Sequence, residues 1–313
     1  MAVKSNFTFP SRDGFNTCYA YSWAPDDGKI RGIIQIVHGM QEHVARYDDF
    51  ATFLAGKGFL VVGADHIGHG KSVSSDTDLG YMTWDHADII LVRNVHRLKK
   101  IVQEQNPGVP IFILGHSMGS LIFRRYITMY GKGIDGALIM STADKSTVIT
   151  RLGIIVSTLK SKFISGYSTS KFLDHSSFGR NNAHIESPRT SYDWLTHDEK
   201  IVDEYIADPL CGFQFKVNGY RALMQLLNYI CKKKNLTTIP KELPILIVAG
   251  TEDPVGDYGK GPTKVYERFK SLNIKDVTLK LYENMRHELL NEIGRKDVYD
   301  YILNWIESHM EKK

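Results

Sequence analysis

An apolar run at residues 110–114 is followed by Gly-His-Ser-Met-Gly at 115–119 and by a helical pattern to about residue 130. A glycine-flanked serine between a strand and a helix predicts a sharp turn with Ser117 at its centre. Such a turn strains the backbone of its central residue and leaves no room for a side chain at Gly115 or Gly119. We therefore expect the Ser117 hydroxyl to be exposed at the end of a strand, beside a helix N-terminus that favours negative charge.

Other apolar segments of strand length alternate with segments of helical periodicity. An opening pair of strands is expected at 5–10 and 16–23, and the buried runs that follow lie at 32–37, 58–65, 110–114, 136–142, 244–250 and 277–282. Continuous apolar strands that alternate with helices are typical of a parallel sheet covered on both faces. The sequence therefore predicts an α/β fold, with a mostly parallel central sheet flanked by helices.

The alternation stops near Asp144 and resumes about a hundred residues later. We interpret the chain as one α/β core, formed by residues 1–143 and 241–313. A helical cap, residues 144–240, is inserted after the sixth strand. No internal repeat or low-complexity segment marks a further domain.

Within the insertion, one helical pattern carries an apolar stripe with Lys160 and Lys162 opposite it, and the stripe consists of Leu152, Ile155, Leu159 and Phe163. Residues 165–183 are rich in serine, glycine and asparagine, and we expect them to form a loop. Thr196 and Glu199 match a capping box, which predicts that a helix begins there.

The composition is that of a soluble globular protein. A net charge of +4 in 313 residues indicates no polyanionic partner, so no nucleic-acid binding is expected. Cys18, Cys211 and Cys231 are too few and too scattered for a disulfide framework or a zinc site, which fits a reducing compartment. The first residues form no apolar signal segment, and no apolar run reaches membrane-spanning length. We expect a soluble cytoplasmic protein.

Two further polar residues follow buried strands late in the chain. A serine hydroxyl is a poor nucleophile until a base takes its proton, and a third group must orient that base. Asp253 follows the run 244–250, and His287 follows the run 277–282. Because parallel strands end at one edge of a sheet, we expect Ser117, Asp253 and His287 to meet there as nucleophile, acid and base.

Each assignment has an alternative. Asp253 can instead cap a turn before Pro254, and Asp144 is the rival acid because it also follows a buried strand. Glu252 is a weaker candidate, since a shift of one residue aims its side chain elsewhere. His287 can be a surface histidine, although it is the histidine that follows the last strand.

The same chemistry requires donors for the negative oxygen of a tetrahedral intermediate. The backbone N–H of Met118, the residue after the serine, is the first expected donor. The second is the N–H of Met40, in the loop that follows the run 32–37. His38 and Gly39 shape this loop, or His38 is a hydrogen-bonded structural histidine.

Some motifs are incomplete. Residues 68–72 resemble a phosphate-binding loop, but the first glycine of that motif would fall on Asp65. His287 opens a zinc-like motif that ends in Asn291 instead of a second histidine. A cluster of His38, His43, His66 and His69 lacks acidic or cysteine ligands at helical spacing. We expect no nucleotide, no metal and no cofactor.

Several segments together carry a resemblance that spans nearly the whole chain: 38–43, 65–72, 115–119, 250–253 and 286–287 in the core, and 191–198 and 208–212 in the insertion. Through them the chain resembles the α/β-hydrolase superfamily, and within it the monoacylglycerol lipase and lysophospholipase-like branch of serine hydrolases. The resemblance implies nucleophile Ser117, acid Asp253, base His287 and oxyanion donors Met40 and Met118. Ser120 stands where glycine is frequent in the family, and we expect no catalytic consequence.

The expected activity is hydrolysis of a single-chain lipid ester, a monoacylglycerol or lysophospholipid, through an acyl-enzyme. The apolar segment 148–164 lines an acyl pocket or makes transient contact with a membrane or micelle surface, or it packs on the core. An aminopeptidase would need an acidic cluster for a free amine, for which the candidates are Asp198, Glu199, Asp203 and Glu204. A non-catalytic receptor on the same fold, and acyl transfer to an alcohol, are further alternatives.

Overall fold

The computed structural model describes residues 2–310, whose strands form one eight-stranded sheet in the order β1-β2-β4-β3-β5-β6-β7-β8. The pairs β1–β2 and β2–β4 are antiparallel, and every pair from β4–β3 to β7–β8 is parallel. The strands are β1 Ala2–Pro10, β2 Thr17–Pro25, β3 Gly32–Val37, β4 Phe59–Ala64, β5 Ile111–His116, β6 Gly136–Met140, β7 Ile245–Gly250 and β8 Val277–Tyr282. The predicted fold class is confirmed.

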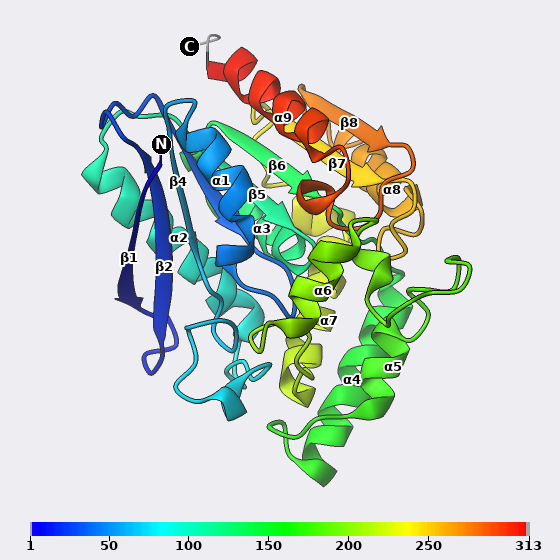
Figure 1. Cartoon of the computed structure of the whole chain (residues 1–313). Coiled ribbons are helices and arrows are strands. Elements are labelled where there is room, and N and C mark those ends of the chain that lie inside the picture. The colour runs from blue at the N-terminus through cyan, green and yellow to red at the C-terminus, as the bar shows by residue number, and fades with distance from the viewer. Residues whose placement is uncertain (1, 311–313) are drawn as a thin grey trace.

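Helices cover both faces of the sheet (Figure 1). They are α1 Asp48–Ala55, α2 Ala87–Gln105, α3 Met118–Tyr130, α4 Thr147–Ile164, α5 Lys171–Phe178, α6 Glu199–Ala207, α7 Val217–Ile230, α8 Lys260–Lys270 and α9 Arg295–Met310. One apolar cluster joins α1 and α9 to the sheet, and another joins α2, α3 and α8 to the opposite face. Strands β3, β5 and β7 are buried at every residue because both of their faces are covered.

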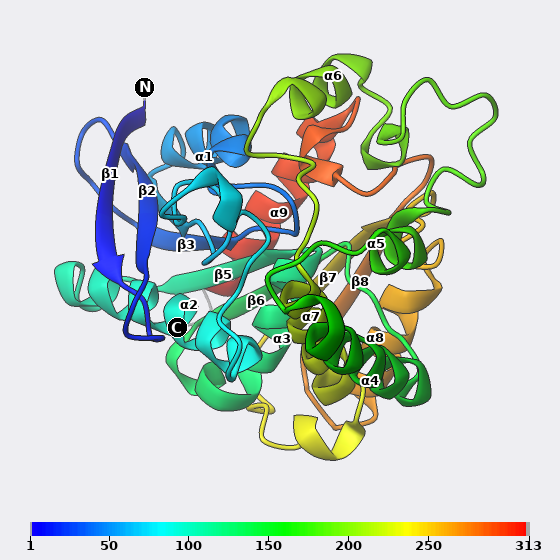
Figure 2. The same ribbon diagram turned by 90° about the horizontal axis from the view of Figure 1, so that it is seen from below.

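The helices α4 to α7 lie between β6 and β7 in the chain, and they gather beyond the end to which the parallel strands point (Figures 1 and 2). Helix α7 anchors this insertion, since Tyr220, Leu226 and Ile230 are buried in the same cluster as α2 and α3. The limits of the cap, 144–240, remain a prediction, because α7 belongs to the packed core as much as to the insertion.

Two local predictions within the insertion need correction, although the helix expected after Thr196 is present and runs from Glu199 to Ala207. Residues 165–183 contain helix α5, which begins at Lys171 and is capped by Ser170, whose side chain accepts a hydrogen bond from the N–H of Leu173. The serine-rich composition hid both the cap and the buried Leu173. Helix α6 is capped by Asp198, whose side chain accepts from the N–H of Lys200, so Thr196 is not the capping residue.

Helix α4 presents its apolar stripe outward. The side that packs against α7 carries small residues, with Thr150 and Ser157 buried and Gly153 against Met224. The large apolar side chains are exposed on the other side, where Leu152, Ile155, Leu159 and Phe163 lie. Among the helices of residues 2–310, none combines the length and the apolar character needed to cross a bilayer.

Candidate active site

The turn from β5 into α3 holds Ser117 in a strained conformation, with φ 51° and ψ −120°. A Cβ atom added at Gly115 would lie 2.7 Å from the carbonyl oxygen of Gly119, and one added at Gly119 would lie 2.0 Å from that of Val37. Both contacts are with backbone atoms that cannot move aside. Glycine is therefore required at both positions, as the sequence predicts, and Ser117 stands at the N-terminus of α3.

This close approach yields a stability prediction. We expect Gly119→Ala to lower the free energy of unfolding by about 3 kcal/mol, because the added methyl group pushes β3 away from α3. Gly56→Ala is the matched control: its Cβ would meet only ordinary contacts of 3.4 Å and longer, in a right-handed conformation. Urea unfolding of both variants measures the difference. Equal stabilities of the two variants would contradict this prediction, because they would show that the turn accommodates a methyl group at residue 119.

His287 and Asp253 form a buried hydrogen-bonded pair in the loops after β8 and β7. The Nδ1 atom of His287 lies 2.9 Å from Oδ1 of Asp253, whose side chain is 0% exposed. A carboxylate only accepts hydrogen bonds, so Nδ1 carries the proton and Nε2 is left as the basic nitrogen. The N–H of Val255 donates to the same carboxylate oxygen at 2.9 Å, and the hydroxyl of Ser141 donates to the His287 carbonyl at 2.7 Å.

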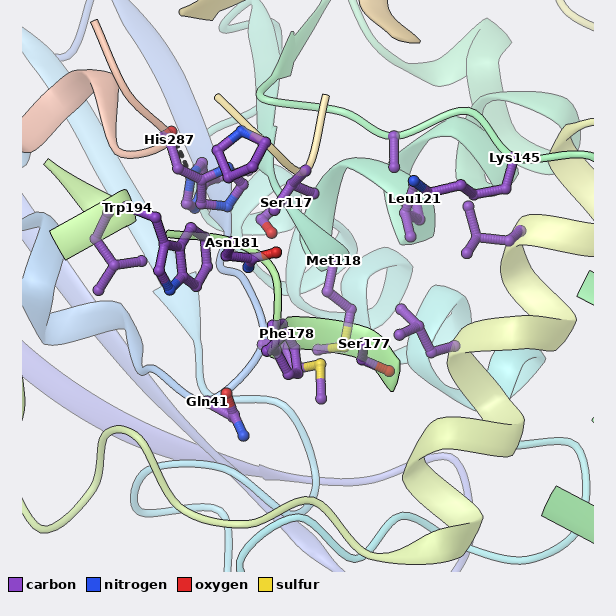
Figure 3. Close-up of a pocket in the computed structure, with 18 of the residues that line it drawn as sticks. Gln41, Ser117, Met118, Leu121, Lys145, Ser177, Phe178, Asn181, Trp194 and His287 are labelled. Carbon is purple, nitrogen blue, oxygen red and sulfur yellow. Dashed lines mark hydrogen bonds between the residues drawn. The ribbon is translucent and has the colours of Figure 1, made fainter. Parts of the chain in front are cut away.

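A cavity of about 340 Å³ opens between the ends of the strands and the insertion, and both Ser117 and His287 line it (Figure 3). This volume is typical of a small-molecule site. Most of the wall is apolar and comes from α3, α4, α7 and the residues before α6, including Leu121, Ile149, Trp194, Leu223, Met224 and Leu227. The ring of Trp194 packs on His287 with centroids 5.1 Å apart, which restricts the imidazole.

The two predicted oxyanion donors line the same cavity. Within residues 2–310, the backbone N–H groups of Met40 and Met118 donate to no other protein group. The N–H of Met118 is in the first turn of α3, where helix N–H groups have no partner in the helix. Both groups are thus available to an anionic oxygen in the cavity.

A network of buried charges forms part of the wall of this cavity, and the sequence analysis missed it. Glu42 accepts hydrogen bonds from the N–H of Gly39, the hydroxyl of Tyr47 at 2.8 Å and Nδ1 of His116 at 3.1 Å. Arg46 lies 3.1 Å from the other oxygen of Glu42 and binds both oxygens of Glu288 at 2.6 and 2.8 Å. The network joins the Met40 loop to His287, because Nε2 of His116 lies 3.4 Å from the His287 carbonyl.

The network shifts the pKa values of its members. Burial opposes ionisation of Glu42, but the hydrogen bond with His116 and the charges of His116 and Arg46 outweigh it and lower the pKa of Glu42. Burial likewise opposes protonation of His116, yet the hydrogen bond with Glu42 and its charge raise the pKa of His116 above 6.5. The four-residue spacing of Glu42 and Arg46 is the one sequence signal that could have indicated this network, although Glu42 lies in a loop and not on a helix.

A pH dependence of stability follows from the raised pKa of His116. The folded state holds that proton more tightly than the unfolded chain, so the stability it contributes is complete below pH 6.5 and is lost as the pH rises through the folded pKa. We expect His116→Asn to cost more stability at pH 6 than at pH 9. Urea midpoints across this range measure the difference.

His96 is a control for which we expect the opposite dependence of stability on pH. Burial lowers the pKa of His96 to about 4, so its neutral form is the one that the folded state favours. Relative to the native protein, His96→Asn should therefore become more stable as the pH falls from 6.5 towards 4. A pH-independent penalty for His116→Asn would contradict the charged pair of His116 and Glu42.

The rival residues have other partners. Asp144 pairs with Arg268, with Nη1 and Oδ2 2.5 Å apart, and does not contact His287. Glu252 lies 3.2 Å from His197, also away from His287. Nε2 of His38 accepts a hydrogen bond from the N–H of His66 at 2.9 Å, which is the structural role left open for it.

The remaining motifs take structural roles. The carboxylate of Asp65 accepts hydrogen bonds from the N–H groups of Val44 and Lys71, at 2.9 and 2.8 Å, so its own side chain fills the turn that resembles a phosphate loop. Within residues 2–310, a single group of three potential metal ligands lies close together, namely His43, Asp208 and Cys211. His43 and Asp208 already bond to each other at 2.8 Å and tie the insertion to the core.

A serine on a strained strand-to-helix turn, with a histidine and a buried aspartate in the loops after the last two strands, is the arrangement of an α/β-hydrolase of the serine type. The family described as serine aminopeptidase, S33, matches residues 28–294, and the chain belongs to this family. Its relatives place it in the monoacylglycerol lipase-like branch, which confirms the resemblance seen in the sequence.

Three comparisons define this similarity. The monoglyceride lipase of Mus musculus is 30% identical over 288 residues, which cover 91% of this chain and 84% of that protein. The monoacylglycerol lipase of Mycolicibacterium smegmatis is 27% identical over 315 residues, with 99% of both chains covered. The crystal structure of a thermostable carboxyl esterase from Bacillus coagulans, in complex with glycerol, has a TM-score of 0.91 at 30% identity and covers 99% of this chain and 100% of that one.

Proposed function

We propose that the protein hydrolyses the carboxylic ester of a single-chain lipid, a monoacylglycerol or a lysophospholipid. The observation that carries this proposal is the apolar cavity, because it contains Ser117 and His287 together and its wall suits an acyl chain. The relatives named monoacylglycerol and monoglyceride lipase support the same substrate class.

In the reaction, Ser117 Oγ attacks the ester carbonyl carbon while Nε2 of His287 takes the serine proton. The carbonyl oxygen becomes negative and accepts hydrogen bonds from the N–H groups of Met40 and Met118. His287 then gives its proton to the alcohol oxygen as the C–O bond breaks, which leaves the acyl group on Ser117. A water molecule attacks this acyl-enzyme by the same steps and releases the fatty acid. Asp253 holds His287 in the required tautomer throughout.

A panel of substrates tests the proposal. Purified protein is assayed with nitrophenyl esters and 1-monoacylglycerols of increasing chain length, and with aminoacyl anilides as the peptidase substrates. We expect hydrolysis of the esters and monoacylglycerols and none of the anilides. Inactivity at every chain length would overturn the proposal.

The family description raises aminopeptidase activity as the second candidate, but the acidic residues that it would use lie elsewhere. None of Asp198, Glu199, Asp203 and Glu204 lines the cavity. Arg189 pairs with Asp203, and Arg295 pairs with Asp198. The carboxylates that do line the cavity, Glu42 and Glu288, are both bound to Arg46, so neither is free to receive a substrate amine.

We further propose that the exposed stripe of α4 rests transiently on an anionic lipid surface. Phe163 is 85% exposed, and Phe172 of α5 is exposed as well. Basic residues accompany these side chains, since residues 145–180 contain Lys145, Arg151, Lys160, Lys162, Lys171 and Arg180 but only one acidic residue, Asp174. Apolar side chains next to basic ones are typical of helices that lie in a membrane interface. We also propose that the protein is located in the cytoplasm.

Sedimentation with phospholipid vesicles tests the surface contact. We expect the protein to bind the vesicles, and to bind them more strongly when an anionic phospholipid is included. We expect Phe163→Glu to weaken this binding about tenfold, because apolar burial is lost. Phe15→Glu is the matched control, because Phe15 is 93% exposed in the turn between β1 and β2, in the core and outside the insertion. Equal loss in both variants, or no binding at all, would contradict the contact.

A further inference from the structure

Lys145 brings a positive charge to the wall of the cavity. It lies between the end of β6 and the start of α4, and it lines the cavity together with Ser117 and Leu121. Its amine end is directed towards the side on which Leu121 and Ser117 lie (Figure 3). The cavity therefore combines an apolar wall with one flexible ammonium group.

The ammonium group of Lys145 has no carboxylate partner within residues 2–310. Among the described residues, no carboxylate oxygen lies within 4.0 Å of the Lys145 amine. Its neighbour in the chain, Asp144, is held by Arg268. The two carboxylates on the cavity wall, Glu42 and Glu288, are held by Arg46.

Lys145 is exposed to solvent as well as lining the cavity, so its ammonium group binds an anion mainly through direct charged hydrogen bonds. The acyl chain of the proposed substrate carries no charge. A negative group of the intact substrate that meets Lys145 would then belong to the alcohol portion of the ester, and phosphate is a common anionic group of lipid alcohols. Lysine suits this role as a compact charge with three donors.

We propose that Lys145 binds a phosphate group on the alcohol portion of the substrate, so that the enzyme prefers a lysophospholipid to a neutral monoacylglycerol. This inference rests on the proposed ester hydrolysis and decides between the two substrate classes that it leaves open. Lys145 thereby sets specificity and takes no part in the bond-breaking steps.

The first test is a ratio of kcat/KM values, measured in micelles of a neutral detergent. The substrates are 1-oleoyl lysophosphatidate (a phosphomonoester), 1-oleoyl lysophosphatidylglycerol (a phosphodiester) and 1-oleoylglycerol. We expect the native protein to have a higher kcat/KM for at least one phospholipid than for 1-oleoylglycerol. We expect Lys145→Gln to lower the ratio of these two kcat/KM values about tenfold, which is the effect of losing one charged hydrogen bond. The phospholipid with the larger change identifies the form of phosphate that is bound.

Lys132→Gln is the matched control, since it removes the same charge from an exposed lysine that lies outside residues 145–180 and does not line the cavity. We expect this variant to keep the native ratio. Equal falls in both variants would show general attraction to an anionic micelle and would overturn the assignment. Added oleate provides a further check. If oleate inhibits the native protein but not Lys145→Gln, and the ratio is the same in both, the assignment would also be overturned, because Lys145 would then bind the product carboxylate.

A second test does not require catalysis. An ether analogue, 1-O-alkyl glycerophosphate, contains no ester, and calorimetry measures its Kd directly. We expect Lys145→Gln to raise this Kd about tenfold and Lys132→Gln to leave it unchanged. If no ester is hydrolysed but this pattern holds, the proposed function fails and the phosphate site stands. Equal Kd values for native protein and Lys145→Gln would overturn the site.

Discussion

Replacement of Ser117 by alanine should lower kcat for a monoacylglycerol about 10⁶-fold, since a serine–histidine–aspartate triad acts as a unit. The protein should remain folded, because the substitution removes one oxygen atom and leaves the glycines of the turn in place. Turnover of 1-monoacylglycerol under matched conditions measures the effect, with circular dichroism to verify the fold.

Ser177→Ala is the control for this loss. Ser177 also lines the cavity, on α5, so its hydroxyl is removed from the same surroundings without touching the strained turn. We expect its kcat to stay close to the native value. A Ser117→Ala variant that retained substantial turnover would show that another nucleophile performs the reaction.

Asp253→Asn should lower kcat about 10⁴-fold, because an amide in this position no longer fixes the proton on Nδ1 of His287 and the wrong tautomer forms. The substitution keeps the size of a side chain that is 0% exposed, so the packing changes little. Single-turnover assays with a nitrophenyl ester measure the loss.

Asp144→Asn decides between the two candidate acids. Its carboxylate binds Arg268 in the structure, so its loss should reduce stability but leave kcat near the native value. If Asp144→Asn lost activity and Asp253→Asn kept it, the assignment of the acid would be reversed.

Ser117, Asp253 and His287 could be proposed from the sequence because each of them follows a strand of one parallel sheet. Residues 244–250 and 277–282 are recognisable as strands from their apolar runs, and the structure places both within one residue of these limits. Once such strands are parallel, Asp253 and His287 must lie at the same edge as Ser117. Topology thus brings together residues that are 136 and 170 positions from Ser117 in the chain.

The sequence did not predict what depends on partners distant in the chain. Glu288 is an ordinary polar residue in the sequence, and it is buried only because Arg46, 242 positions away, meets it. The stripe of α4 has the periodicity of a buried face, yet it is exposed because α7 packs against the small residues on the other side. Periodicity shows which residues share a helix face, but not which face the rest of the fold covers.

A crystal structure of the protein with a long-chain phosphonate, which mimics the tetrahedral intermediate, tests the proposed site most directly. We predict a covalent bond from phosphorus to Ser117 Oγ, a phosphonyl oxygen between the N–H groups of Met40 and Met118, and Nε2 of His287 within hydrogen-bond distance of the serine oxygen. A phosphonate bound to another residue, or a His287 ring turned away from Ser117, would contradict the account.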